Sequence, residues 1–161
     1  MGKQNGLPER LSPEDEREFP SLFRSGYRVS SCRDVTHNCI AYAADDTTRI
    51  WDPGMMPLPG YYWPPNVPRD YSPESLRLAF ESVGYEICIG GHQEVGFDKV
   101  ALYVDTTGEW SHAAKQQAAG DWGSKVGKAE DIRHNSEHCF GDSIYGEVIY
   151  YMKRPRPQAE R

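Results

Sequence analysis

The chain has 161 residues, of which 38% are hydrophobic and 26% charged, and its formal net charge is −6 at pH 7. This length suits one domain with its own core, and the acidic balance argues against a general nucleic-acid-binding protein, which normally presents a basic surface. No segment approaches the roughly 18 apolar residues of a membrane span, so we expect neither nucleic acid nor a membrane as a partner.

The four cysteines are expected to be free thiols. They are Cys32, Cys39, Cys88 and Cys139, and the first residues of the chain contain no apolar core of a secretory signal. Thiols persist in a reducing cytoplasm, so we expect a cytoplasmic location, with delivery by a specialised secretion route as the alternative. Cys88, inside the apolar segment YEICIG, is expected in the core.

The chain divides into three parts by composition. Residues 1–26 are polar and interrupted by proline, and they are interpreted as a surface arm with one helical turn capped by Ser12 and ended by Pro20. Residues 27–154 carry the regular apolar patterns and form the single folded domain. Residues 155–161, PRPQAER, are expected to be a disordered tail.

Two helices are predicted in the first half of the domain. Residues 38–44, NCIAYAA, are alanine-rich and have Asn38 as a cap. The stronger helix begins at Ser72, with proline at its first position, and ends at Gly84. Its apolar stripe consists of Leu76, Ala79, Phe80 and Val83.

Strands follow these helices. They are predicted at residues 85–90, 98–104, 109–117, 122–126 and 144–154, with DTTG joining the second and third as a hairpin. Because strands follow helices and do not alternate with them, the expected class is α+β.

A proline- and aromatic-rich segment, from Ile50 to Pro73, lies between the two helices. Its prolines forbid long regular structure, while Trp51, Tyr62 and Trp63 indicate that it packs against the domain. These three aromatic residues could form the wall of a substrate site or a cover over the core.

Cys39 is the leading candidate for chemistry. A thiol at the start of a helix gains from the exposed main-chain N–H groups, which favour thiolate. A nucleophilic cysteine also needs a histidine to take its proton, and His112, on the predicted strand EWSHAAKQ, is the expected partner. Free cysteine is also among the most buried residue types, so an inert Cys39 is the alternative.

Several motifs occur together along most of the domain. These are NCIAYA, YWP, GYE, KVALYV, SHAAKQ, DWGSKVG, EDIRH and YGEV, within about residues 30–155. In this order they resemble an uncharacterised prokaryotic domain family with the pattern NCIAYA, YWP, GYE, ALY, THAA, W-S-K-L-G, E-D-I-x-H and YG. That resemblance is specific for the family and implies no activity.

The chain also resembles, more distantly, the papain-like superfamily, which includes NlpC/P60 amidases. This resemblance implies a papain-like α+β fold, with Cys39 as nucleophile and His112 as base. NlpC/P60 enzymes place their histidine one strand earlier, where this chain has Lys99. The third catalytic residue is open among Asp121, Ser124 and Asp131, and Asp131 ranks first because EDIRH belongs to the family pattern.

Other polar residues near these motifs have two interpretations each. Asn38 could donate to an oxyanion, although a helix cap is the more common role. Ser124 and Lys125 could position a substrate, or they could be a turn hydroxyl and a solvated lysine. His37 is discounted as the base, because sequence neighbours seldom converge on one attacking atom.

Histidines and a cysteine at the segment HNSEHC suggest a metal site as a further alternative. His134, His138 and Cys139 could bind zinc together with Cys32 or Cys39, but their spacing fits no strong zinc signature. We therefore expect no metal and no cofactor.

The sequence as a whole predicts a cysteine-dependent hydrolase of a protein or peptide-like amide, with Cys39, His112 and Asp131 as the catalytic residues. The alternative is a non-catalytic interaction module that binds a partner through the proline- and aromatic-rich segment. The oligomeric state is left open.

Overall fold

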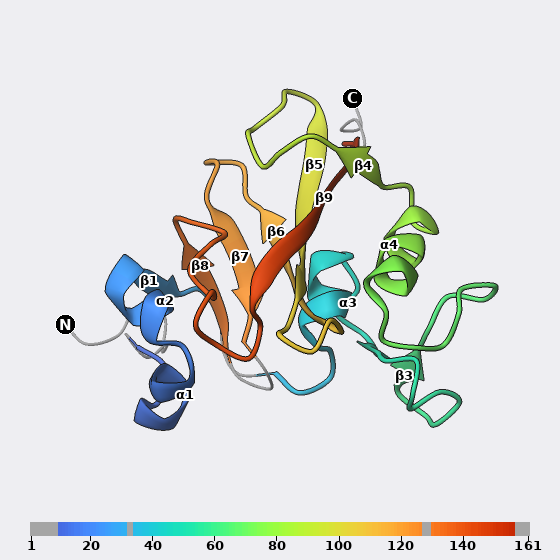
Figure 1. Cartoon of the computed structure of the whole chain (residues 1–161), viewed down its shortest axis with the longest axis horizontal. Helices are drawn as coiled ribbons and strands as arrows, with labels where there is room; N and C mark the ends of the chain where they lie inside the picture. Colours follow the sequence, from blue (N-terminus) through green and yellow to red (C-terminus); the bar gives the residue numbers. More distant parts are fainter. Residues whose placement is uncertain (1–9, 32–33, 127–129, 157–161) are drawn as a thin grey trace.

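The computed structural model describes residues 10–31, 34–126 and 130–156 (Figure 1). Its helices are α1 (Pro13–Glu18), α2 (Pro20–Ser25), α3 (Cys39–Ala43) and α4 (Pro73–Glu81). Its strands are β1 (Tyr27–Val29), β2 (Ile50–Trp51), β3 (Tyr61–Tyr62), β4 (Glu86–Cys88), β5 (Phe97–Val104), β6 (Trp110–Gln116), β7 (Trp122–Lys125), β8 (Asp131–His134) and β9 (Glu147–Pro155). The predicted α+β class is confirmed. In the described parts of the chain, no helix has the length and apolar character needed to cross a membrane.

One sheet organises the domain, with strand order β1-β8-β7-β6-β5-β9-β4 and antiparallel pairing throughout. β2 and β3 form a separate, short parallel pair. The predicted hairpin joins β5 to β6, and it places Tyr103 opposite His112 and Leu102 opposite Ala113. This register decides which residues of β6 point to which face of the sheet.

The sheet has a separate apolar core on each face. The core on the α3–α4 side contains Ile40, Leu76, Phe80, Leu102, Ala113 and Met152. The core on the other side contains Phe19, Leu22, Tyr103, Ala114, Phe140 and Tyr145. Side chains alternate between the faces of a strand, so neighbouring residues of β6 belong to different cores.

The N-terminal segment differs from the surface arm expected for residues 1–26. Ser12 caps α1 as predicted, since its hydroxyl accepts a hydrogen bond from the Asp15 N–H at 3.2 Å. Leu11, Phe19 and Leu22 are nevertheless buried against the sheet. Through these three apolar side chains, an otherwise polar segment belongs to the core on the face away from α3. Residues 1–9, and 157–161 of the expected tail, lie outside the described parts.

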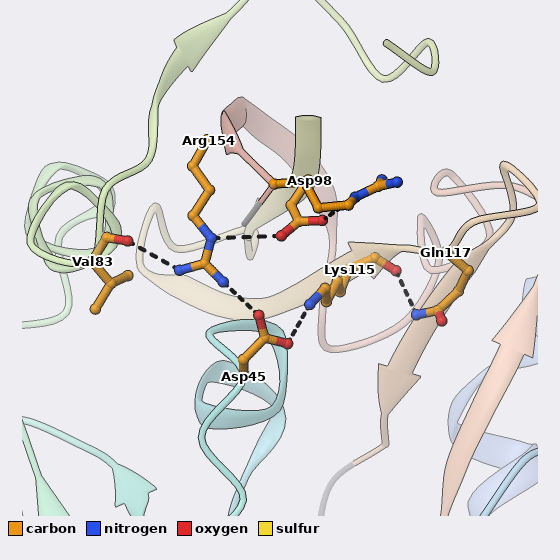
Figure 2. A network of polar contacts seen from close by, with 7 residues as sticks. Asp45, Val83, Asp98, Lys115, Gln117 and Arg154 are labelled. Carbon is orange, nitrogen blue, oxygen red and sulfur yellow. Dashed lines mark hydrogen bonds and ion pairs between the residues drawn. The ribbon is translucent and has the colours of Figure 1, made fainter. Parts of the chain in front are cut away.

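A polar network fixes the C-terminal end of α3 to the sheet and to α4 (Figure 2). Asp45 accepts hydrogen bonds from Lys115 of β6 and from Arg154 of β9. The same Arg154 donates to the Val83 carbonyl at 3.0 Å and lies 3.7 Å from Asp98. Lys115 therefore points toward α3, which places alternate residues of β6 on that face.

Candidate functional site

Asn38 holds the start of α3 through three hydrogen bonds. Its Oδ1 accepts hydrogen bonds from the Ala41 N–H at 3.1 Å and the Trp51 N–H at 3.2 Å. Its Nδ2 donates to the Trp51 carbonyl at 2.9 Å. The predicted cap is thus confirmed, and the same side chain ties α3 to β2. An amide with these partners serves the fold, and it has little left to offer a reaction intermediate.

Cys39 is the first residue of α3 and is only partly exposed. Burial raises the pKa of its thiol to about 11, although the main chain of Ala113 and the charge of Lys125 act in the opposite direction. The thiol is therefore protonated at neutral pH. A short helix of five residues does not compensate for that desolvation.

His112 points to the other face of the sheet. Its ring stacks on Tyr145 with centroids 3.9 Å apart and contacts Phe140 edge-on at 5.0 Å. Ala113, the next residue along β6, packs on the α3 side. The sheet therefore lies between Cys39 and the His112 imidazole, and the structure does not bring these two predicted partners together.

Lys125 and Asp131 do lie on the Cys39 side. The Lys125 ammonium is completely buried and is 3.9 Å from Asp131 Oδ1, while Ser31 donates to Asp131 Oδ2 at 2.6 Å. Lys125 also acts electrostatically on Cys39. Lys125 thus lies near both Cys39 and Asp131, so three of the predicted site residues are grouped, and none of the three is an imidazole.

His37 is the imidazole nearest to this group in sequence, and it is also buried. Its Nδ1 is 3.8 Å from Asp34, and its ring is parallel to Tyr42 at 6.4 Å. Neither ring nitrogen has a hydrogen-bond partner among the described residues. Among the described residues, His37 makes neither a hydrogen bond nor an ion pair with Cys39.

A buried row of hydrogen-bonded polar side chains lies on the face of the sheet opposite α3. Ser124 Oγ lies 3.0 Å from His112 Nε2 and 2.8 Å from His134 Nε2, and His134 Nδ1 lies 2.9 Å from the Ser136 carbonyl. A carbonyl only accepts, so His134 Nδ1 carries the hydrogen and His134 Nε2 accepts from the serine hydroxyl. Ser124 in turn accepts from His112 Nε2–H. Sequence reasoning missed this row of side chains.

This assignment leaves His112 Nδ1 as a buried acceptor with no hydrogen-bond partner among the described residues. Burial lowers the pKa of His112 well below its usual value and lowers that of His134 to about 4. Both rings are therefore neutral at pH 7. Ser124 is a buried link between two histidines and does not face Cys39, so it is not placed to position a substrate there.

The zinc alternative has no support in the geometry. Cys139 Sγ is 3.4 Å from His134 Nδ1, whereas His138 is exposed and lies beside Glu137. Within the described parts of the chain, no group of three His, Cys, Asp or Glu side chains is arranged to hold a metal ion. Cys32 lies outside those parts.

The aromatic residues predicted as a substrate wall are mostly core. Trp51 and Trp63 are buried, and each indole N–H donates internally, to Asp46 at 2.9 Å and to the Pro68 carbonyl at 3.0 Å. Tyr62 is partly buried beside Trp51. The packed-cover interpretation of this segment describes Trp51 and Trp63, whose rings are buried and form no open wall.

A different part of the same segment is exposed. Residues 54–60, GMMPLPG, connect β2 to β3, and they are called the apolar tip here. Met55 is 38% and Leu58 51% exposed, and Pro57 and Pro59 are also at the surface. The tip belongs to the loops that project from the body beside β3 (Figure 1). It is the exposed apolar part of the proline-rich segment.

Comparison with known proteins identifies the family. A family model described as "Domain of unknown function (DUF7689)" matches residues 28–153, which is most of the chain. The chain belongs to the DUF7689 family. A search of curated proteins and a search of solved structures each found no match. The predicted membership of an uncharacterised domain family is therefore confirmed. The family domain begins at β1, so α1 and α2 precede it.

Proposed function

We propose that this DUF7689 domain is a non-catalytic interaction module that binds a partner protein through the apolar tip. The observation that carries this proposal is the combination of exposed apolar side chains with a fixed main chain. Clustered exposed apolar residues mark interaction sites more often than scattered ones do, and four such residues, Met55, Pro57, Leu58 and Pro59, lie within five positions here. A loop already held in one conformation loses little entropy on binding, so more of its contact energy contributes to affinity.

Side chains from outside the tip hold its main chain. Arg69 donates to the carbonyls of Pro53, at 3.3 Å, and of Met56. Asp52 accepts from the Gly54 N–H at 2.9 Å and from the Tyr71 hydroxyl. These bonds fix both the start and the middle of the loop. They leave the apolar side chains at its surface free to enter a pocket on another protein.

The papain-like amide hydrolase suggested by the motifs has less support. It requires a thiolate at Cys39 and an imidazole within hydrogen-bond reach. Burial keeps the Cys39 thiol protonated, and His112 lies behind the sheet. Lys125 acts electrostatically on the thiol and lies 3.9 Å from Asp131, but neither side chain is the imidazole that this mechanism requires. The interaction module needs none of these residues to react.

A competition experiment tests the proposal. A photo-reactive benzoylphenylalanine at position 58, in the full chain in its own cells, is expected to give one dominant protein adduct. The unlabelled wild-type chain should abolish this adduct by competition. A chain with Met55→Asp and Leu58→Asp should compete at least about 30-fold less well, because charges in a desolvated anchor site cost 2 kcal/mol or more.

Ile144→Asp is the matched control, since Ile144 is 65% exposed and lies in a loop at the end of the other face. It should compete as well as the wild type. Circular dichroism must show that both variants are folded. Equal competition by the tip variant and the wild type, or no adduct at position 58, would contradict the proposal.

A further inference from the structure

The core on the face away from α3 is closed by two segments that are separate in sequence. Residues 11–25, with α1 and α2, contribute Phe19 and Leu22, and residues 136–145 contribute Phe140 and Tyr145. We call these two segments the cover. A hydrogen bond from the Ser21 N–H to Asp142 and an ion pair between Arg24 and Asp142, both 3.1 Å or shorter, join them to each other. Both contacts involve Asp142, so α2 and the 136–145 segment are linked at this one side chain.

The histidine pair lies directly beneath this cover. His134 contacts Phe140 edge-on at 5.1 Å, and His112 is stacked on Tyr145. His112 and Ser124 are completely buried, and His134 almost so. Solvent therefore cannot reach either imidazole unless the cover moves away from the sheet.

Protonation of either imidazole is unfavourable in the closed arrangement, because burial lowers the pKa of both. A proton on His134 Nε2 removes the acceptor of the Ser124 hydroxyl, which could then donate only to His112 Nε2, with the His112 hydrogen moved to the unpartnered Nδ1. A proton on His112 Nδ1 creates an N–H donor where no acceptor is available among the described residues. Either event also leaves a positive charge buried among aromatic rings, which is unfavourable.

The groups around the two histidines do not offset the cost of a buried positive charge. Asp121 and Glu137 favour the charged form of His134, but Asp121 is paired with Arg133 and Glu137 accepts from Tyr151. Cys139 beside His134 and Tyr103 beside His112 are neutral at the pH where histidine titrates, because burial raises the pKa of both groups. A positive charge on His134 also disfavours protonation of His112.

We propose that the cover is an acid-released element: protonation of His112 and His134 frees it from the sheet, while the core between the sheet and α3–α4 stays folded. The two cores share only the sheet, so one can open without the other. Release exposes the apolar residues under the cover together with Cys139. The domain thereby presents a second surface in acid that is closed at neutral pH.

The pKa values decide whether acid favours the open or the closed state of the cover. An open state has ordinary histidine pKa values near 6.5, whereas burial lowers that of His134 to about 4 and that of His112 as well. The open state therefore binds protons first as the pH falls. Each histidine favours opening by up to tenfold per pH unit below about 6.5.

Two cysteines provide a probe for each face. Cys139 lies in the cover, and Cys39 lies on the α3 side. The rates at which 4,4′-dithiodipyridine modifies each thiol in the full chain are measured from pH 7 to pH 4, with the sites resolved by peptide mass spectrometry. We expect the ratio of the Cys139 rate to the Cys39 rate to rise at least 100-fold over this range.

Histidine variants test whether the rise in the ratio of the Cys139 rate to the Cys39 rate depends on His112 and His134. His112→Gln keeps a donor for Ser124 and His134→Gln keeps an acceptor, so the double variant should show a flat ratio. His138→Gln removes an exposed histidine next to Glu137 and should behave as the wild type. If the double variant does not fold, the pH dependence of the ratio in the wild type still tests the proposal. A constant ratio, or a parallel rise of both thiols with loss of far-ultraviolet circular dichroism, would overturn the proposal.

Discussion

Replacing Phe140 by alanine is expected to lower the free energy of unfolding by about 3–5 kcal/mol, roughly 10 °C in melting temperature. Phe140 is completely buried and contacts the rings of Phe19, Tyr103, His112 and Tyr145 at centroid distances between 5.0 and 5.7 Å. Its removal leaves a cavity that none of these aromatic rings can fill without leaving its own contacts. Urea denaturation at pH 7 measures the loss.

Phe23→Ala is the control for this prediction. Phe23 lies in α2 of the same cover but is 54% exposed, so its truncation removes little buried surface. We expect a change of less than about 1 kcal/mol. A Phe140→Ala variant no less stable than Phe23→Ala would mean that the cover does not close over this core.

The second large loss of folding stability is expected when Asn38 is replaced. Asn38→Ala removes the cap of α3, worth about 1 kcal/mol, and takes away the partner of both main-chain groups of the buried Trp51. Each buried main-chain group without a partner costs about 1–3 kcal/mol, so the total loss is expected to be at least about 3 kcal/mol. Thermal and urea unfolding at pH 7 provide the value.

Two comparisons separate the parts of this effect. Ser12→Ala removes a helix cap alone and should cost about 1 kcal/mol. Asn38→Asp keeps the acceptor for Ala41 and Trp51 but cannot donate to the Trp51 carbonyl, so its loss should fall between the two alanine variants. Equal losses for Ser12→Ala and Asn38→Ala would show that the link from α3 to β2 contributes nothing.

Local signals in the sequence were sufficient for most elements. Ser72, Pro73 and the stripe including Leu76 and Phe80 predict α4, because cap, first-turn proline and helical spacing agree. The Asp-Thr-Thr-Gly turn between two apolar runs predicts the β5–β6 hairpin. β1 and β8 were not predicted, because each is short and neither shows a long alternating pattern.

The candidate site depended on information that local patterns do not contain. Alternation along SHAAK places His112 and Lys115 on opposite faces of β6, and this much is readable from the sequence. Which face α3 packs against is decided by the two cores together, and Cys39 could be assigned to either face in advance. The chain order of cysteine, helix and histidine strand is therefore compatible with a papain-like site and with the separation observed.

The N-terminal segment and the proline-rich segment also show that local sequence patterns do not determine which apolar side chains are buried. Phe19 and Leu22 are isolated among charged residues, so their burial comes from contacts with residues more than 100 positions away, such as Phe140. In the proline-rich segment the sequence indicates packing, and Trp51 and Trp63 are indeed buried. Only the structure separates these rings from the exposed Met55 and Leu58 of the apolar tip.

The most direct test of this account is the pH dependence of Cys39 alkylation by iodoacetamide, in the wild type and in His112→Gln. With a thiol pKa near 11 and no imidazole partner, the rate should rise about tenfold per pH unit from pH 6 to pH 10 without a plateau. The His112→Gln profile should coincide with it. A plateau below pH 8 that disappears in His112→Gln would show that thiol and imidazole meet, and would restore the hydrolase.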